Sequence, residues 1–209
     1  MRRLVVPVAV GAVVALLGAG CSGDEEPSTA PTSAPTSAPP AGDGGAASGS
    51  PPASPTPAAE LPTGCDSLLP FTDLDQALGR PLFGQTVFTK GVAQPSIGRT
   101  GRVTCGFGVP AGGRGVPPVE VGVSTYTDVE SASRRVQATV SQLRSIGASQ
   151  AEATVSGLPA TLLGTGTSFT VVLAQGARTV AVTVQRRLGG GADRAAVAVA
   201  ERVIANLGD

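Results

Sequence analysis

The sequence of 209 residues predicts one α+β domain, an antiparallel sheet covered by helices, that follows a disordered tether. Two observations favour this fold class. From Leu61 onward, segments with the hydrophobic spacing of helices and strands follow one another in the order helix, strands, helix, strands, helix. Two of the strand-like segments are separated only by Gly176-Ala177, which is the spacing of a β-hairpin and not of a βαβ unit. We therefore expect residues 61–209 to form the folded domain.

Residues 1–20 have the features of an export signal. Two arginines after the initiator methionine precede an apolar stretch from Leu4 to Leu17, which is shorter than the roughly twenty residues that span a membrane. The small residues 18–20 then lead to Cys21, an arrangement that resembles a bacterial lipobox, although Gly18 stands where leucine is usual. The alternative is an ordinary secretory signal with a cysteine there by chance. We predict that residues 1–20 are a lipoprotein signal peptide and that lipid on Cys21 holds the protein on the extracytoplasmic face of the cell membrane.

Residues 21–60 are predicted to be the acylated N-terminus and a disordered tether. After Cys21 this segment contains nine prolines, five acidic residues and no basic, aromatic, Leu, Ile, Val or Met residue. Such a composition cannot bury enough apolar surface to offset the entropy lost on ordering. Frequent proline favours extended conformations, so the tether places the domain away from the bilayer.

Three helices are predicted in the domain, and the first two have clear ends. The first runs from Thr72, as its N-cap, to Gly79 just past its end. The second begins at a capping box formed by Thr127 and Glu130 and stops at Gly147. Its apolar residues recur at steps of three and four and are expected to face inward: Val129, Ala132, Val136, Val140, Leu143 and Ile146.

The third helix is predicted from about Asp193 to Leu207, with Gly208 as its terminator.

The predicted strands lie between the helices. In one of them, Val119–Tyr126, apolar and polar residues alternate, so one face is apolar. The other predicted strands are Arg102–Val109, Thr154–Leu163, Thr167–Gln175 and Arg178–Arg186.

The domain contains two cysteines, Cys65 and Cys105, and with Cys21 lipidated these two are left as an even pair. An exported chain meets an oxidising compartment, where an even pair of cysteines is typical of a disulfide. A redox pair usually has CxxC spacing, and a zinc site needs about four ligands, whereas this domain has two thiols and no histidine. We therefore predict a structural Cys65–Cys105 disulfide that stabilises the domain by roughly 3–4 kcal/mol, and no metal site.

Several motifs together resemble a group of actinobacterial surface lipoproteins that have a two-cysteine domain of unknown function. These are the lipobox, the tether, the Cys65-Asp66-Ser67-Leu68-Leu69 segment before a helix that ends in Leu78-Gly79, and Val103-Thr104-Cys105-Gly106-Phe107. The segment Val155–Ala160, followed by paired strands and a terminal helix, is similar to exported mycobacterial lipoproteins and to kinase sensor domains with a helix-covered antiparallel sheet. Phe107 stands where that group often has tryptophan. The resemblance implies the same fold and no catalytic residues.

The composition argues against most enzyme classes. The chain has no histidine, so the usual serine hydrolases lack their base, and a Ser–Lys pair would depend on Lys90 alone. A glycosidase needs only two carboxylates, but the domain has no tryptophan and one tyrosine to stack on a sugar. Residues 61–209 carry thirteen basic and ten acidic side chains, which is not the strongly basic field of a nucleic-acid binder. We expect no enzyme activity, no cofactor and no nucleic-acid partner.

Two functions remain open. The first is a non-catalytic binding module for a small ligand, a lipid or an envelope component. The second is a structural or accessory subunit of an envelope protein complex without a ligand pocket. A deep pocket between sheet and helices would favour the first, and a tightly filled core would favour the second.

An anion site is predicted where the last strand leads into the third helix. Arg186 and Arg187 precede the glycines 189–191, and Arg194 follows in the first turn of that helix. Glycine-rich turns at helix N-termini attract anions, and arginine forks suit phosphate or carboxylate. The alternative is a flexible polar turn in which Asp193 caps the helix. If that alternative holds, a binding module needs a pocket elsewhere, and we expect it between the sheet and helix 128–146.

Overall fold

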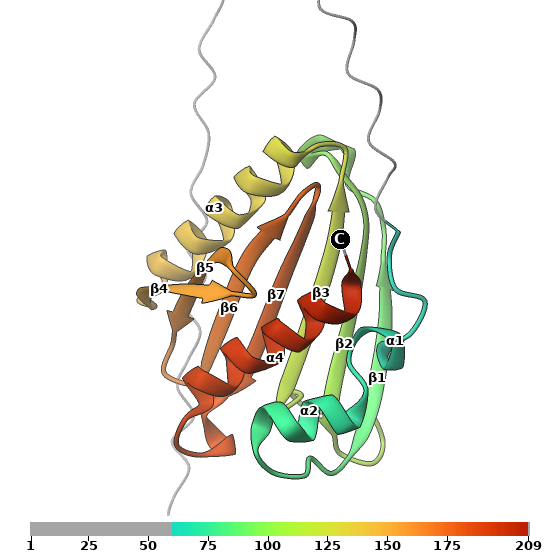
Figure 1. The fold of residues 1–209 in the computed structure, drawn as a ribbon, viewed down its shortest axis with the longest axis vertical. Helices are drawn as coiled ribbons and strands as arrows, with labels where there is room; N and C mark the ends of the chain where they lie inside the picture. Colours follow the sequence, from blue (N-terminus) through green and yellow to red (C-terminus); the bar gives the residue numbers. More distant parts are fainter. Residues whose placement is uncertain (1–59, 209) are drawn as a thin grey trace, which may run out of the picture. The chain divides into compact units, whose positions relative to one another are not determined.

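The computed structural model describes residues 60–208. The predicted signal peptide, Cys21 and the tether up to residue 59 lie outside the described residues. The described part of the chain forms a seven-stranded antiparallel sheet with four α-helices (Figure 1). The predicted α+β class and the antiparallel sheet are thus confirmed. Within residues 60–208 no helix combines the length and the apolar character needed to cross a membrane.

The sheet consists of two meanders that meet in its middle. Its strands are β1 (Gln85–Gly91), β2 (Arg99–Val109), β3 (Val119–Tyr126), β4 (Ser149–Val155), β5 (Leu158–Gly164), β6 (Ser168–Gln175) and β7 (Arg178–Gln185). Their order across the sheet is β1-β2-β3-β7-β6-β5-β4. Every neighbouring pair is joined by a short local connection except β3 and β7, so this pairing is the seam between the two meanders.

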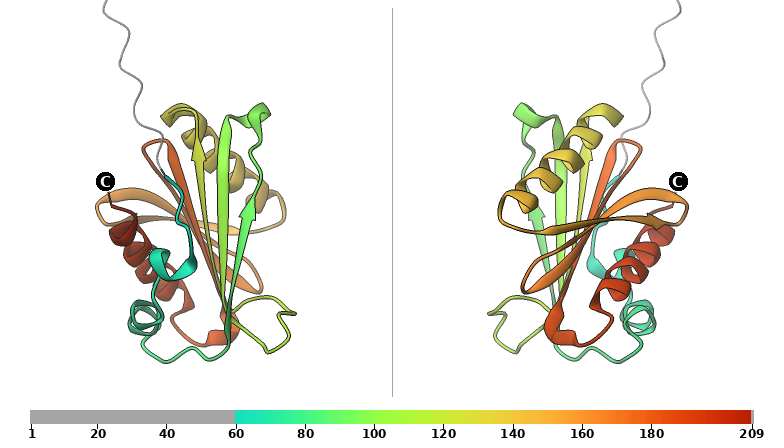
Figure 2. Two further views of the ribbon diagram at one scale, coloured as in Figure 1. Left: turned by 90° about the vertical axis from the view of Figure 1, so that its right-hand side faces the viewer. Right: turned by 90° about the vertical axis from the view of Figure 1, so that its left-hand side faces the viewer.

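Helices lie on both faces of the sheet (Figure 2). The α-helices are α1 (Cys65–Leu68), α2 (Phe71–Leu78), α3 (Val129–Ser145) and α4 (Ala192–Leu207), with 3-10 turns η1 (Pro95–Ile97) and η2 (Arg186–Leu188). On one face α4 packs on β6 and β7, and α2 packs against α4. On the opposite face α3, which connects β3 to β4 along the chain, packs mainly on β6 and β7 and also contacts β3 and β5.

The main core lies between the sheet and α4. Alternate residues of β2, β3 and β7 point to this face and are buried there, as the period of a strand requires. They meet the apolar stripe of α4. The fully buried residues of these three strands and of α4 are Cys105, Phe107, Val119, Val121, Val123, Val180, Val182, Val184, Ala196, Val199, Ala200 and Val203. At its margin the Phe71 ring meets the Phe107 ring edge-on, with 6.0 Å between their centres. The residues that alternate with these in β2, β3 and β7 therefore point to the opposite face of the sheet, away from the main core.

The predicted disulfide is present. Cys65 of α1 and Cys105 of β2 are bonded, with 5.6 Å between their Cα atoms and a sequence separation of 40. Both cysteines are buried in the core. The bond therefore fastens the first helix of the domain to the second strand of the sheet.

The two predicted N-caps are wrong, although the helices themselves are confirmed. In α2 the N-cap is Pro70 and not Thr72, because the Pro70 carbonyl accepts the backbone N–H groups of Asp73 and Leu74. In α3 the N-cap is Asp128 and not Thr127. The helix ends are better predicted, since Gly79 has the left-handed backbone (φ 64°) of a C-cap.

A carboxylate begins α3 in place of the predicted capping box. Asp128 Oδ1 accepts the Ser131 N–H at 2.6 Å, and the Thr127 hydroxyl donates to Oδ2 of the same carboxylate. The backbone N–H of Ser131, and then the hydroxyl groups of Thr127 and Ser131, donate to this carboxylate and lower the pKa of Asp128 below its ordinary value of 3.8. Glu130 pairs with Arg134 instead of reaching back to the cap.

The predicted burial of α3 is only partly right. Ala132 is buried, but Val129 and Ile146 are 59% and 72% exposed. Val129 is the first residue of α3 and Ile146 is its C-cap, so both lie at the ends of the helix. Val136, Val140 and Leu143 between them are half-buried.

Two strands differ from the prediction. The segment Thr154–Leu163 is not one strand but the end of β4 and most of β5, because Ser156 and Gly157 form a turn with φ of 50° and 82°. β1 was not predicted, since it is an edge strand whose residues are mostly exposed and show no apolar alternation. The hairpin at Gly176-Ala177 is confirmed between β6 and β7.

Candidate binding cleft

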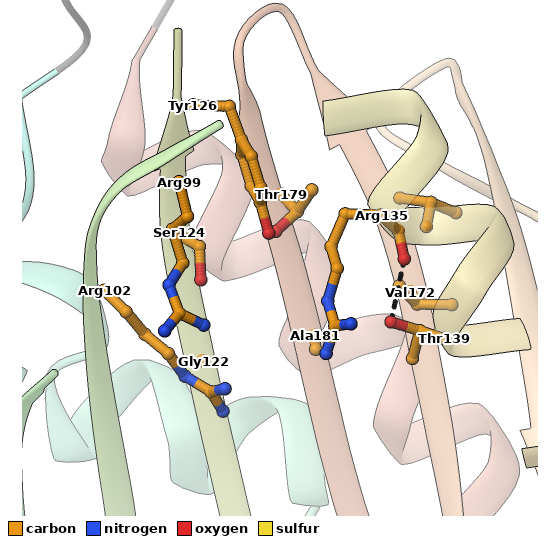
Figure 3. A pocket seen from close by; sticks show the side chains of 11 residues that line it. Arg99, Arg102, Gly122, Ser124, Tyr126, Arg135, Thr139, Val172, Thr179 and Ala181 are labelled. Atoms are coloured by element: carbon orange, nitrogen blue, oxygen red, sulfur yellow. Dashed lines mark hydrogen bonds between the residues drawn. The ribbon is translucent and has the colours of Figure 1, made fainter. Parts of the chain in front are cut away.

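A cleft of about 100 Å³ lies between α3 and the sheet face that points away from the main core. Its floor consists of small and hydroxyl side chains that the strand register places in two neighbouring rows. One row joins Ser124 of β3 to Thr179 of β7, and the other joins Gly122 to Ala181. Directly paired residues of an antiparallel sheet point to the same face. Because these side chains are short, space remains above the seam between β3 and β7 (Figure 3).

Three arginine side chains line this cleft from two sides (Figure 3). Arg99 and Arg102 come from β2, and Arg102 is the register partner of Ser124. Arg135 comes from α3, with Thr139 one turn later on the same helix. All three arginines are half-buried. We call this site the arginine cleft.

The charge of the arginine cleft is not balanced by the protein. No aspartate or glutamate is among its lining residues. In the described part of the chain the one ion pair is Arg134–Glu130, so none of the three cleft arginines is paired with a carboxylate. Three like charges therefore face one space, which creates a local positive potential.

The guanidinium groups also have few hydrogen-bond partners. Arg99 Nη2 donates to the Val92 carbonyl at 3.3 Å, while Arg99 Nε is buried and has no partner. Arg102 Nε donates to the Thr104 hydroxyl at 3.3 Å. Each guanidinium has five donors, so most of them are left for solvent or for a ligand.

A second hollow, of about 690 Å³, adjoins the arginine cleft. It lies beside β4 and β5 and shares Val136 of α3 and Val172 of β6 with the cleft. Its other lining residues are mostly polar, among them Gln150, Glu152 and Thr161. The arginine cleft and this second hollow therefore lie side by side under α3, and Val136 and Val172 line both of them.

The arginines of the predicted anion site lie elsewhere and are exposed. Arg186 Nε donates to the Thr165 carbonyl at 2.6 Å, and its guanidinium stacks over the Phe169 ring at 3.8 Å. Arg187 donates to the Val116 carbonyl, in a different loop. α4 begins at Ala192 with Gly191 as its N-cap, so Asp193 lies in the first turn and is not the cap. Anion binding at Arg186, Arg187 and Arg194 stays a prediction.

The arginines of the cleft are not among the predicted site residues, although the cleft lies between the sheet and helix 128–146, where the sequence predicts a pocket if the anion site fails. The one local sign of it is the alternation of polar Arg102 and Thr104 with buried Val103 and Cys105 in β2. That pattern shows which face Arg102 occupies, but not which residues of other strands lie beside it. Within residues 60–208 no group of three or more His, Cys, Asp or Glu side chains could hold a metal ion.

The comparisons with known proteins find similarity only among solved structures. The sequence matches no known protein family and no curated protein. Among solved structures, the chain is similar to the extracellular domain of PknH from Mycobacterium tuberculosis, with 11% sequence identity and a TM-score of 0.45. The similarity covers 68% of this chain and 93% of that domain. At this identity it assigns the chain to no family.

Proposed function

We propose that this protein is a non-catalytic binding module on the extracytoplasmic face of the cell membrane, anchored by lipid at Cys21. Its ligand is a small molecule, a lipid or an envelope component that enters the arginine cleft. In this proposal the chain is a surface lipoprotein of the actinobacterial kind that its motifs resemble, and helices cover a sheet that carries the site.

One observation carries this proposal. Arg99, Arg102 and Arg135 converge on a cleft in which the described residues supply no carboxylate. Half-burying charged groups without a carboxylate partner lowers stability, so a fold that retains three of them in one place is typical of a binding site. The disulfide supports the compartment, because such bonds persist mainly in oxidising environments.

Native mass spectrometry of protein purified from its own envelope tests this proposal. The wild type should carry a bound mass that the cleft-filling variant Gly122→Val lacks. A Cβ at Gly122 meets the flexible end of Arg102 at 3.6 Å and the Ala181 carbonyl oxygen at 3.9 Å, both ordinary van der Waals distances, so the substitution occupies the cleft without displacing backbone. Gly166→Val is the matched control, since that glycine lies in an exposed loop with open space around it. A bound mass that is unchanged in Gly122→Val, or absent from the wild type, would contradict the proposal.

The accessory-subunit alternative is favoured by a different surface. Phe83 before β1 and Val92 after it are 84% and 80% exposed, and Phe88 within this edge strand is 40% exposed. Exposed aromatic residues beside an unpaired strand edge are typical of a docking surface. Crosslinking of the wild type and of a Phe83→Ser/Phe88→Ser variant in intact cells tests this alternative. A partner band that the variant loses would favour the accessory role over the cleft.

A further inference from the structure

The donors in the arginine cleft indicate which kind of ligand it takes. Besides three guanidinium groups, the lining contains the hydroxyls of Ser124, Thr179 and Tyr126, which donate as readily as they accept. The Thr139 hydroxyl also lines the cleft but already donates to the Arg135 carbonyl at 2.9 Å. The three arginines can only donate, and their charge repels a cation. An oxyanion accepts from these donors and also balances their charge, whereas a neutral acceptor leaves the charge unbalanced and a cation is repelled.

The position of the arginines allows them to close on one group. Arg99 and Arg102 reach over β3 from β2, and Arg135 reaches down from α3 on the opposite side (Figure 3). The floor between them is formed by Gly122 and Ala181 in one row and by Ser124 and Thr179 in the other, whose side chains are absent or short. Guanidinium forks fit the paired oxygens of carboxylates and phosphates.

The size of the cleft limits what enters it. Its volume of about 100 Å³ is well below the roughly 300–1,000 Å³ of pockets that enclose a whole drug-sized ligand. It has room for a compact head group and not for a complete large molecule. The remainder of a larger ligand must lie outside the cleft.

We infer that the arginine cleft binds one compact oxyanion group, a carboxylate or a phosphate, between Arg99 and Arg102 on one side and Arg135 on the other. This inference rests on the proposed function and adds the chemical class of the ligand. A carboxylate and a phosphate share the charge and the paired oxygens that the arginines recognise, and they differ in charge and in the number of oxygens.

Isothermal titration calorimetry on the full mature chain in non-ionic detergent tests the inference. The titrants are sodium phosphate and sodium acetate at constant ionic strength, with sodium chloride as the reference. Nanodiscs with and without phosphatidylglycerol provide the lipid-bound phosphate. We expect saturable binding of at least one oxyanion, and the stronger titrant identifies the head group. Binding should weaken as salt is added, because the interaction is between charges.

Variants of single arginines test whether the oxyanion binds in the arginine cleft. Arg102→Gln and Arg135→Gln should each weaken binding by about tenfold or more, since each removes a charged donor. Arg102→Lys should weaken binding less than Arg102→Gln, because lysine keeps the positive charge and lacks only the paired donors of the guanidinium. Arg144→Gln is the control on the same helix, since Arg144 is exposed and does not line the cleft. Thermal melts of every variant show whether the fold is retained.

Backbone amide shifts of the isotope-labelled protein separate the two arginine clusters. If the oxyanion binds in the cleft, the shifts concentrate in residues 122–126 and 178–182. Shifts confined to residues 189–194, or binding that Arg102→Gln and Arg135→Gln leave unchanged, would overturn the inference. So would the absence of saturable binding to every titrant at millimolar concentration.

Failure of this inference can be told apart from failure of the proposed function. If native mass spectrometry finds a neutral ligand that Gly122→Val displaces, the binding module stands and the oxyanion inference is wrong. If neither experiment detects a ligand in the cleft, both are wrong.

Discussion

Reduction of the Cys65–Cys105 disulfide should lower the stability of the domain by a predictable amount. The bond closes a loop over 40 residues of sequence separation. In the chain-entropy model, opening a loop of this length gives the unfolded chain about 4 kcal/mol of additional entropy at 25 °C. For a domain of this size each kcal/mol shifts the melting temperature by about 2–4 °C, so we expect a decrease of about 8–16 °C.

The assay compares thermal melts of the wild type with and without a reductant, followed by circular dichroism. A Cys65→Ala/Cys105→Ala variant is the control, because its melting temperature should not respond to the reductant. The variant should also melt below the reduced wild type, since both cysteines are buried in the core and the substitution removes their packing. A reduced wild type that melts within a degree of the oxidised protein would refute this account of the disulfide.

Three further predictions concern other parts of the chain. Cys21→Ala should release the protein from the membrane or leave it uncleaved, and a variant that is processed and partitions into detergent like the wild type would disprove the lipobox. Asp128→Ala should lower the melting temperature at neutral pH by removing the cap of α3. Because the folded-state pKa of Asp128 is lower than 3.8, this difference should be complete above that pH and disappear as the pH falls through the folded pKa. Phe107→Ala should cost about 3–5 kcal/mol in denaturant unfolding, since its ring is fully buried, and a loss below about 1 kcal/mol would contradict the packing described.

Elements of the fold with local signals could be predicted from the sequence. Gly79 and Gly208 mark helix ends because they supply backbone angles that other residues adopt at a cost. The hairpin at Gly176-Ala177 depends only on its two turn residues and their flanking strands. The turn at Ser156-Gly157 has the same kind of signal, but the apolar residues on both sides continue through it like one strand. β1 has no such signal, because an edge strand with exposed faces needs no apolar alternation.

The arginine cleft could not be predicted because it depends on pairings between distant segments. Arg102, Ser124 and Thr179 form one row only through the register of β2 with β3 and of β3 with β7. A shift of one residue in either register would turn a whole strand over and place the arginine against the core. The sequence indicates the polar face of each strand, but the partner across the seam is decided by the packing of the complete sheet.

The seam between the two meanders has a consequence for the order of folding. Hairpins within each meander close short loops, in about 1–10 μs, whereas β3 and β7 must meet across the intervening α3, β4, β5 and β6. Pairings of such long sequence separation form slowly, so the seam should be the last part of the sheet to close. The arginine cleft has its floor on both sides of this seam. A ligand held there binds only the closed sheet, and by mass action it slows hydrogen exchange at the amides of β3 and β7.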